Sequence, residues 1–203
     1  MIMAFNKFFK KAFAIIYKKV TFYIFQWPRI IKYKIISTCN NVRGHPTIFQ
    51  PVLMNGMGHI DFGGNVNLGV QVSPYFYSSY IYIDSRTDKS NIKFGDNVYI
   101  NNNCVFISEG EGIEIGNNVL IGTSCEIYDS DFHDLNPAFR FGGNISMAKV
   151  RVGDNVFIGS NVKILKGVEI GRDCVIANGS VVTKSLPPKA IAAGVPAKVI
   201  KFL

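Results

Sequence analysis

The chain has 203 residues, 48% of them hydrophobic and 18% charged, which is enough apolar material for a folded core and excludes a disordered chain. The formal net charge is +8, and residues 1–36 carry the whole excess with eight Lys or Arg and no acid. The neutral remainder argues against a nucleic-acid partner, and four widely spaced cysteines without a C-x-x-C pair indicate neither a zinc site nor a disulfide framework.

Residues 1–40 read as a separate helical arm. Lysines at 7, 10, 11 and 18 recur at near-helical spacing among aromatic and aliphatic residues, which predicts a basic amphipathic helix. We expect this helix to end before Trp27 and Pro28 and to continue as an extended segment. Such a composition is typical of a helix that binds a membrane surface through residues 1–36; the alternative is a helix that packs across the body or a subunit seam. The lysines interrupt any signal-peptide pattern, so we expect a cytoplasmic protein, located at the inner face of the membrane if the arm binds lipid.

We assign residues 41–186 to one repeat body, in which a six-residue period is seen from Phe62 onward. From Val152 the chain reads VGDNVF, IGSNVK, ILKGVE, IGRDCV and IANGSV, and similar units begin at Phe94 and Ile115, with a weaker copy from Phe62. Each unit begins with a large apolar residue, often has Gly second, and has a small residue fifth. We interpret the unit as a short inward-facing strand followed by a tight corner, where Gly and Asn tolerate a positive φ. Three cysteines occupy the fifth position and are expected to be small buried residues (Cys104, Cys125 and Cys174).

Three hexapeptides make one triangular turn of 18 residues with parallel strands stacked about 4.8 Å apart. We therefore expect an all-β prism of about five turns, roughly 24 Å tall at that spacing. Between Ile127 and Val152 the period is lost, which predicts a loop over residues 128–149. A loop that interrupts a regular solenoid is where function is usually found. This loop contains His133, the only histidine after the repeats begin at Phe62, since His45 and His59 precede them.

Other polar residues lie near this loop and at the end of the chain. Asp129 and Asp131 precede the histidine. For each of them there are three roles to consider: it orients the imidazole, it accepts a hydrogen bond from a hydroxyl of the acceptor, or it forms an Asx-turn. Arg140 contacts the acceptor or pairs with an aspartate. Beyond the last repeat, Lys184 and the tail over residues 187–203 add four lysines without an acid, which predicts a cationic rim for phosphates or a solubilising surface.

The segment NVYINNNCVFISEGEGIEIGNNVLIGTSCEIYDSDFHDLNP (97–137) and the terminal VVTKSLPPKAIAAGVPAKVIK (181–201) resemble the hexapeptide-repeat acyltransferases, in particular the galactoside and maltose O-acetyltransferase branch and related polysaccharide O-acetyltransferases. The resemblance covers about residues 60–203. It implies a left-handed parallel β-helix, a homotrimer with active sites between subunits, and acetyl-CoA as co-substrate without a metal. It makes His133 the catalytic base and places Asn101 and Glu109, the latter where an Asp is common, at the acceptor. By the same resemblance, the coenzyme contacts are Ser160, Asn178, Thr183, Lys184, Lys198 and Lys201.

The chemistry agrees with this assignment. Transfer of an acyl group from a thioester to a hydroxyl requires removal of the hydroxyl proton, and an imidazole with an ordinary pKa near 6.5 can accept it. We therefore expect an acetyl-CoA-dependent O-acetyltransferase that acts directly, without an acyl-enzyme, on a sugar or glycan hydroxyl in cell-surface polysaccharide biosynthesis. The alternatives are another small acceptor (an antibiotic hydroxyl, a serine or an amino-sugar amine) and a non-catalytic β-helix scaffold.

Overall fold

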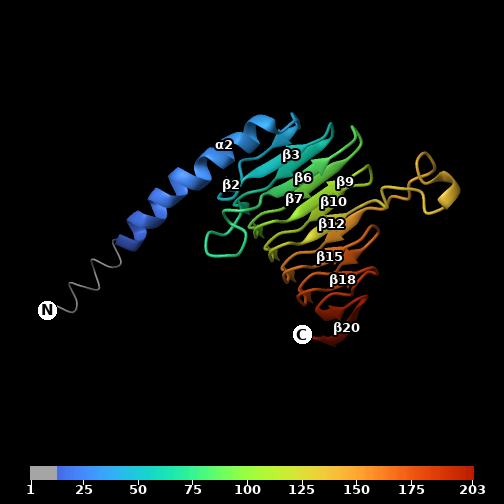
Figure 1. The fold of residues 1–203 in the computed structure, drawn as a ribbon. Helices are drawn as coiled ribbons and strands as arrows, with labels where there is room; N and C mark the ends of the chain where they lie inside the picture. Colours follow the sequence, from blue (N-terminus) through green and yellow to red (C-terminus); the bar gives the residue numbers. More distant parts are fainter. Residues whose placement is uncertain (1–12) are drawn as a thin grey trace.

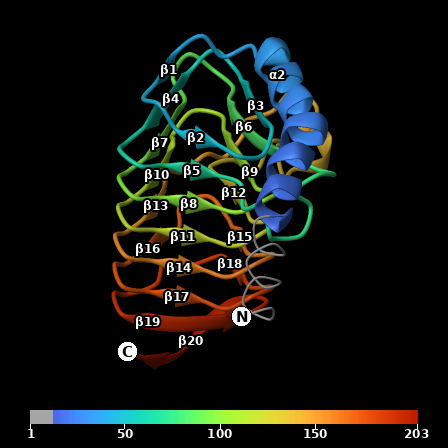
Figure 2. The same cartoon turned by 90° about the vertical axis from the view of Figure 1, so that its left-hand side faces the viewer.

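The computed structural model describes residues 13–203, which form a three-sided parallel β-helix with one long helix at its N-terminal end (Figure 1). The chain visits three sheets in a fixed order on every turn, and consecutive turns pair in parallel. Figure 2 shows the turns stacked from β1 at one end to β20 at the other. The predicted fold class, a left-handed parallel β-helix with an N-terminal helix and a C-terminal extension, is confirmed.

The three sheets, named A, B and C here, each take one strand from every turn. Sheet A contains β1 (Val42–Arg43), β4 (His59–Phe62), β7 (Asn91–Phe94), β10 (Ile113–Ile115), β13 (Val150–Val152) and β16 (Glu169–Ile170). Sheet B contains β2 (Thr47–Ile48), β5 (Asn67–Leu68), β8 (Tyr99–Ile100), β11 (Leu120–Ile121), β14 (Phe157–Ile158), β17 (Val175–Ile176), β19 (Ala190–Gly194) and the antiparallel β20 (Ala197–Phe202). Sheet C contains β3 (Val52–Asn55), β6 (Ile81–Ser85), β9 (Val105–Ser108), β12 (Glu126–Tyr128), β15 (Lys163–Ile164) and β18 (Val181–Val182).

The core is a column of stacked apolar side chains inside the prism. The first and fifth residues of the repeat both point inward, so Ile100 and Cys104 are fully buried, and Cys125 and Cys174 are buried as predicted. Phe94 stacks on Phe62 of the turn before it, with ring centroids 5.1 Å apart. Because burial of one such side chain contributes about 1.5–3 kcal/mol, this repeated column supplies most of the stability of the β-helix.

The backbone conformation at the corners differs from the interpretation of the sequence. The fourth residue of the repeat, and not the second, takes the positive φ, as at Asn97 (φ 56°) and Asn118 (φ 57°). Glycine is needed at the second position because successive corners stack closely. A Cβ on Gly95 would lie 2.7 Å from the Gly116 carbonyl oxygen. The asparagines in turn bond along the stack, since Asn97 Nδ2 donates to Asn118 Oδ1 at 3.2 Å.

The β-helix is longer than the expected five turns, since each sheet has at least six strands within the described residues. The additional turn is residues 42–55, where β1, β2 and β3 pair with the next turn although the hexapeptide pattern is absent. At the other end, β19 and β20 extend sheet B and cover the last turn, so the tail over residues 187–203 closes the prism.

The predicted end of the helix before Trp27 is wrong. Residues 13–21 are helical, a π-helical turn η1 (Phe22–Gln26) follows, and α2 (Trp27–Ile36) continues to Ile36. Trp27 N–H donates to the Phe22 carbonyl, five residues back, so the helix widens just before the proline. Pro28 has no N–H to donate into the preceding turn, and the wide π-helical turn lets the helix continue past this proline. Lys7, Lys10 and Lys11 lie outside the described residues. Within the described residues, no helix is long and apolar enough to cross a membrane.

Two segments leave the regular turns. The first excursion, residues 69–80, connects sheet B to sheet C after β5 and lies beneath the helix. The second excursion, residues 129–149, connects β12 to β13 and contains the short 3-10 helix η2 (Pro137–Phe139). It projects away from the prism on the side opposite the helix in Figure 1. This segment coincides with the predicted loop at 128–149 and carries His133.

Candidate active site

The second excursion is rooted by a fully buried carboxylate, Asp129. Asp129 Oδ1 accepts from Glu109 N at 2.7 Å, and Oδ2 accepts from Ser108 Oγ and Gly112 N, both at 2.7 Å. These donors come from the corresponding corner of the preceding turn. Asp129 thus anchors the loop to the β-helix through groups of the preceding turn, and not through the Asx-turn that was the structural alternative from the sequence.

The corner beneath the loop holds a chain of charged groups. Glu109 Oε1 accepts from Arg86 Nη1 at 2.8 Å, and Glu109 Oε2 accepts from Ser130 Oγ at 3.1 Å. Arg86 Nε also donates to Asp84 at 2.8 Å. Although burial opposes its charge, these two carboxylates leave the pKa of Arg86 raised above its ordinary value. Both carboxylate oxygens of Glu109, a predicted acceptor-contacting residue, therefore already have donors.

Phe132 directs the chain outward immediately before the histidine. It has a φ of 61°, a conformation that is strained for a bulky residue. Its ring is held from two sides: the Arg86 guanidinium lies 4.9 Å from the ring centroid, and Tyr128 packs edge-on at 5.4 Å. Burial, reinforced by the hydrogen bond that it donates to Glu126, raises the pKa of Tyr128, so this phenol remains protonated.

His133 follows this turn and is exposed. Its Nδ1 lies 3.3 Å from the carbonyl oxygen of Arg140 across the loop. If Nδ1 carries the proton, it donates to that oxygen and leaves Nε2 as a free base directed elsewhere. Arg140 thus contacts the imidazole through its backbone, while its side chain is exposed. Asp134 closes the loop tip by accepting from Asn136 N and Asn144 N at 2.8 and 3.0 Å.

Asp131 lies on the face of the loop that looks back at the prism. Its Oδ2 is 3.4 Å from Lys166 Nζ, which makes an ion pair, but this buried oxygen accepts no hydrogen bond from the described residues. The imidazole partner in the structure is the Arg140 carbonyl and not this aspartate. Asp131 therefore retains a lone pair for a donor that residues 13–203 do not provide.

Three further predicted residues lie on a different edge of the prism, at the corner between sheets B and C. Asn101 follows β8 there, and its Nδ2 donates to Ser73 Oγ at 3.1 Å. Ser160 and Asn178 follow β14 and β17 on the same edge, and Ser160 N donates to Asn178 Oδ1 at 2.8 Å. Within one chain, this edge is separate from the corner between sheets C and A that carries Glu109, Asp131 and His133.

The predicted coenzyme residues at the C-terminal end are all exposed. Thr183 and Lys184 follow β18, the last strand of sheet C. Lys198 and Lys201 lie on β20, opposite Ala193 and Ile191 of β19. The predicted cationic rim is therefore divided between two strands that close the same end of the β-helix.

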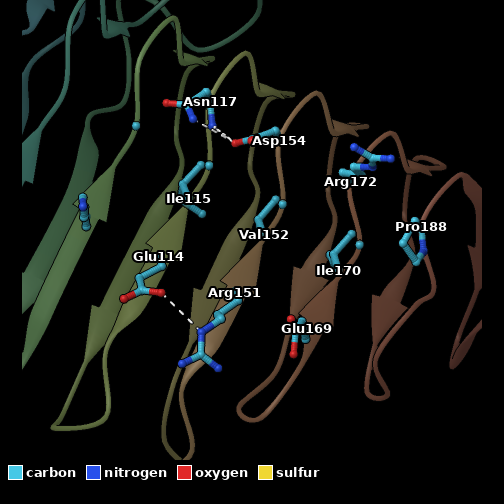
Figure 3. A pocket seen from close by; sticks show the side chains of 15 residues that line it. Glu114, Ile115, Asn117, Arg151, Val152, Asp154, Glu169, Ile170, Arg172 and Pro188 are labelled. Atoms are coloured by element: carbon cyan, nitrogen blue, oxygen red, sulfur yellow. Dashed lines mark hydrogen bonds and ion pairs between the residues drawn. The ribbon is translucent and has the colours of Figure 1, made fainter.

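A shallow hollow of about 610 Å³ lies along sheet A and contains none of the predicted site residues (Figure 3). Figure 3 shows Glu114 paired with Arg151, where Nε and Oε2 are 3.3 Å apart, and Asp154 accepting from Asn117 N–H. The lining has no net charge, because it holds three basic and three acidic side chains (Lys93, Arg151, Arg172, Glu114, Asp154 and Glu169). Without an excess of positive charge, the hollow offers little for a polyanionic ligand, and the exposed loop is the stronger candidate site.

The cysteines are poor nucleophiles in this fold. All four are free and buried away from solvent. Burial raises the pKa of Cys104 and Cys174, whereas a hydrogen bond with Cys104 lowers the pKa of the buried Cys125. Among residues 13–203, no group of three His, Cys, Asp or Glu side chains is placed to hold a metal ion.

Sequence reasoning missed Arg86, although this residue joins Asp84, Glu109 and Phe132. The available signal was the irregular spacing between Ile83 and Phe94, which begin successive repeat units and are 11 residues apart, where the regular spacing is six. Arg86 lies in that irregular segment and reaches Glu109 in the next turn, 23 residues away.

Comparison with known proteins agrees with this architecture. The profile of the family described as "Hexapeptide repeat of succinyl-transferase" matches residues 149–184. Over these residues the chain is similar to the hexapeptide-repeat family. Among the relatives, it resembles the sugar O-acetyltransferases. It is 38% identical over 130 residues to the galactoside O-acetyltransferase of Escherichia coli, a match that covers 64% of this chain and 59% of that protein. A Saccharomyces cerevisiae protein named as a candidate acetyltransferase is 41% identical over 130 residues, or 64% of this chain and 61% of the relative.

This hexapeptide-repeat protein thus matches about three fifths of the length of these curated relatives. Among solved structures, it is similar to a maltose O-acetyltransferase from Clostridium difficile, with a TM-score of 0.51, 25% identity, and coverage of 92% of this chain and 84% of the other. A hexapeptide-repeat acetyltransferase from Vibrio cholerae gives a TM-score of 0.54 at 24% identity over 88% of this chain and 81% of that one, which supports the fold.

Proposed function

We propose that this protein is an acetyl-CoA-dependent O-acetyltransferase that acts on a hydroxyl of a sugar or glycan. The observation that carries the proposal is His133, exposed on a projecting loop with its Nδ1 against the Arg140 carbonyl. Further support is the sequence likeness to the galactoside O-acetyltransferase of Escherichia coli. A structure similar in fold, from Vibrio cholerae, was determined in complex with acetyl coenzyme A.

In this proposal His133 Nε2 removes the proton from the acceptor hydroxyl as the hydroxyl oxygen bonds to the acetyl carbon. Acetyl-CoA supplies the thioester, and its thiolate leaves and recovers the proton. The Arg140 carbonyl holds the imidazole in the tautomer that keeps Nε2 unprotonated. Asp131, whose Oδ2 has no hydrogen-bond donor among the described residues, accepts from a second acceptor hydroxyl. No cysteine is needed as a nucleophile, in agreement with the burial of all four.

The coenzyme is proposed to lie along the edge that carries Ser160 and Asn178 and to place its phosphates at Lys184, Lys198 and Lys201. The corner at Gly179 fits a ligand lying against the backbone, because a Cβ there would have no neighbour within 4 Å. The three lysines are exposed and follow or form the last strands. Their charge suits a polyanionic nucleotide.

The site is proposed to form between two copies of the chain in a homotrimer. The residues assigned to the coenzyme arm and those around His133 occupy different edges of one prism, so a single chain does not bring them together. A copy related by threefold rotation would set the His133 loop of one chain beside the Ser160 edge of the next, because a three-sided prism presents flat faces for such packing.

The first test is a transfer assay with the full chain, acetyl-CoA and a panel of acceptors that includes a galactoside, maltose, an amino sugar and serine, with products identified by mass spectrometry. We expect a gain of one acetyl group on a sugar hydroxyl. His133→Ala should lower kcat by about 10²- to 10⁴-fold and leave acetyl-CoA binding unchanged, since it removes the base and not a coenzyme contact. His45→Ala, a change of an exposed histidine on the first turn, is the control and should retain full activity. Turnover by His133→Ala within twofold of the native rate would contradict this role, and acetylation of an amine alone would contradict the sugar hydroxyl.

A further inference from the structure

The N-terminal helix exposes many large apolar side chains to solvent. From residue 13 to residue 36 its large apolar side chains lie mostly in solvent, at exposed fractions between 42% and 76%. Contiguous exposed apolar surface of this extent marks a binding surface. The residues are Phe13, Ile15, Ile16, Tyr17, Val20, Tyr23, Ile24, Phe25, Trp27, Ile31, Ile35 and Ile36.

Only one narrow side of the helix contacts the rest of the chain. Gln26 is fully buried, and its Nε2 donates to the carbonyl of Phe76 at 2.7 Å. Arg29 Nη2 donates to the carbonyl of Ser79 at 2.7 Å, and Tyr33 packs on Tyr80 with ring centroids 4.6 Å apart. These contacts fix the helix to the first excursion, and Figure 1 shows its N-terminal part extending away from the three sheets. The exposed residues are therefore held on a rigid, well-attached element.

The charges on the helix have a single sign. Residues 1–36 contain eight Lys or Arg and no acidic residue, whereas the rest of the chain is balanced. Within the described helix, Lys18, Lys19, Lys32 and Lys34 are all exposed. Apolar and aromatic side chains mixed with lysines, and no acid, are the composition of a helix that lies in the headgroup region of an anionic bilayer.

We propose that the helix over residues 13–36 binds the surface of a membrane that contains anionic lipids, lies along the headgroups, and so places the β-helix next to that surface. The charge pattern favours lipid over a second copy of this chain. Another copy presents a body with as many acidic as basic residues and offers no excess negative surface for these lysines. The proposal goes beyond the acetyl-transfer function and does not depend on it.

The chain has a built-in probe for this contact. Its single tryptophan, Trp27, is on this helix and is 47% exposed. Titration of the full chain with vesicles of phosphatidylcholine and an equal amount of phosphatidylglycerol should shift the Trp27 emission to shorter wavelength. Vesicles of phosphatidylcholine alone should bind much more weakly, and raised salt should reverse the binding. No shift with the anionic vesicles, or equal binding to the neutral ones, would overturn the proposal.

Paired variants test which groups are responsible. Lys18→Gln with Lys19→Gln should weaken binding about thirty-fold, because each lysine near an anionic surface contributes ~1 kcal/mol. Arg43→Gln with Lys89→Gln removes the same charge from exposed positions of the β-helix and should leave binding within about twofold. Equal losses for both pairs would overturn the assignment to this helix.

A second pair of substitutions tests whether lipid or another protein chain covers the exposed face of the helix. Ile24→Asn with Phe25→Asn changes two side chains that are 58% and 61% exposed, so folding should be unaffected. We expect this variant to lose vesicle binding and to keep the native oligomer mass, measured by light scattering without lipid. A lower oligomer mass with intact vesicle binding would instead identify the helix face as a contact between copies.

Discussion

The two excursions from the β-helix begin in similar ways and end in opposite environments. Each leaves at a corner and passes through an aromatic residue in the left-handed region, Tyr75 with a φ of 66° and Phe132 with a φ of 61°. The first excursion then packs beneath the helix, where Phe76 is 2% exposed. The second projects into solvent, where Phe141 is 97% exposed. The same local conformation therefore begins a segment that packs against the helix in the first excursion and a segment that is exposed to solvent in the second.

The two excursions differ in which side chains hydrogen-bond to their backbone N–H and C=O groups. In the first excursion, buried amide side chains supply the partners: Gln50 Nε2 donates to the Tyr75 carbonyl, and Asn102 Nδ2 donates to the carbonyls of Val70 and Pro74. The second excursion is fixed at its root by Asp129 and closed on itself by Asp134. A loop held along its length stabilises the fold, whereas a loop held only at its root leaves polar groups for another molecule.

The largest predicted effect compares one residue type in the two excursions. Phe76→Ala should cost about 3 kcal/mol, because it empties a buried site between the helix and the first excursion. Phe141→Ala should change stability by less than about 0.5 kcal/mol, since its side chain is almost wholly in solvent. Urea unfolding of both variants measures the difference. Equal costs would show that the second excursion packs against the body in solution.

The second prediction concerns the root of the exposed excursion. Asp129→Ala removes a buried carboxylate and leaves the N–H groups of Glu109 and Gly112 without an acceptor, so we expect a loss of about 3 kcal/mol in the free energy of unfolding. Asp129→Asn, which keeps one oxygen, should lose less. Hydrogen exchange should report faster exchange at Glu109 and Gly112 in the alanine variant. Unchanged exchange there would mean that the loop is held by other contacts.

A smaller loss is expected from the amide that supports the first excursion. Asn102 is fully buried and bonds both N–H and C=O of Val70, so Asn102→Ala should cost about 2 kcal/mol and increase hydrogen exchange at residues 69–80. Asn67→Ala, whose amide bonds only Asn65, is the matched control and should stay within about 0.5 kcal/mol. The comparison fails if both variants lose the same stability.

The repeat pattern predicted the features that depend on residues close together along the chain, namely the inward positions and the position of the loop. Inward positions such as Ile100 and Phe106 follow from the period alone, because every turn imposes the same geometry, and the position of the loop follows from the lost period. The first turn lies within the predicted body of residues 41–186, but its strands could not be placed from the sequence. Arg43 and Thr47 belong to segments without the hexapeptide pattern, although they pair in register with the next turn.

Sequence reasoning could not predict contacts between side chains that are far apart along the chain. Gln26 finds its acceptor 50 residues away, and Arg86 finds Glu109 23 residues away, with no motif to mark either pair. The candidate base was found because it is the only histidine of the repeat body within an interrupting segment. The contact of its Nδ1 with the Arg140 carbonyl depends on how the loop tip closes, which no spacing reveals.

The smallest effect is expected where the second excursion rejoins sheet A. Outward side chains on neighbouring strands of this sheet alternate in sign, and the order across the sheet is Arg43, Asp61, Lys93, Glu114, Arg151 and Glu169. Lys149, the last residue of the excursion, also pairs with Glu114. The hydrogen bond from Lys149 is the main reason that the pKa of Glu114 lies below its ordinary value of 4.5.

A carboxyl group with a lowered folded-state pKa stabilises the fold above its unfolded-state pKa, and this contribution disappears as the pH falls through the folded-state value. Glu114→Gln should therefore cost less than ~1 kcal/mol at pH 7, because the pair is largely exposed. The difference from the native chain should shrink as the pH falls below about 4.5 and vanish below the lowered folded-state pKa. Glu111→Gln, which removes the same charge from an exposed position in the same turn, is the control and should stay within about 0.5 kcal/mol at pH 7. Unfolding measured across this range decides the matter: a Glu114→Gln deficit that persists in acid would mean that this junction is held by packing and not by charge.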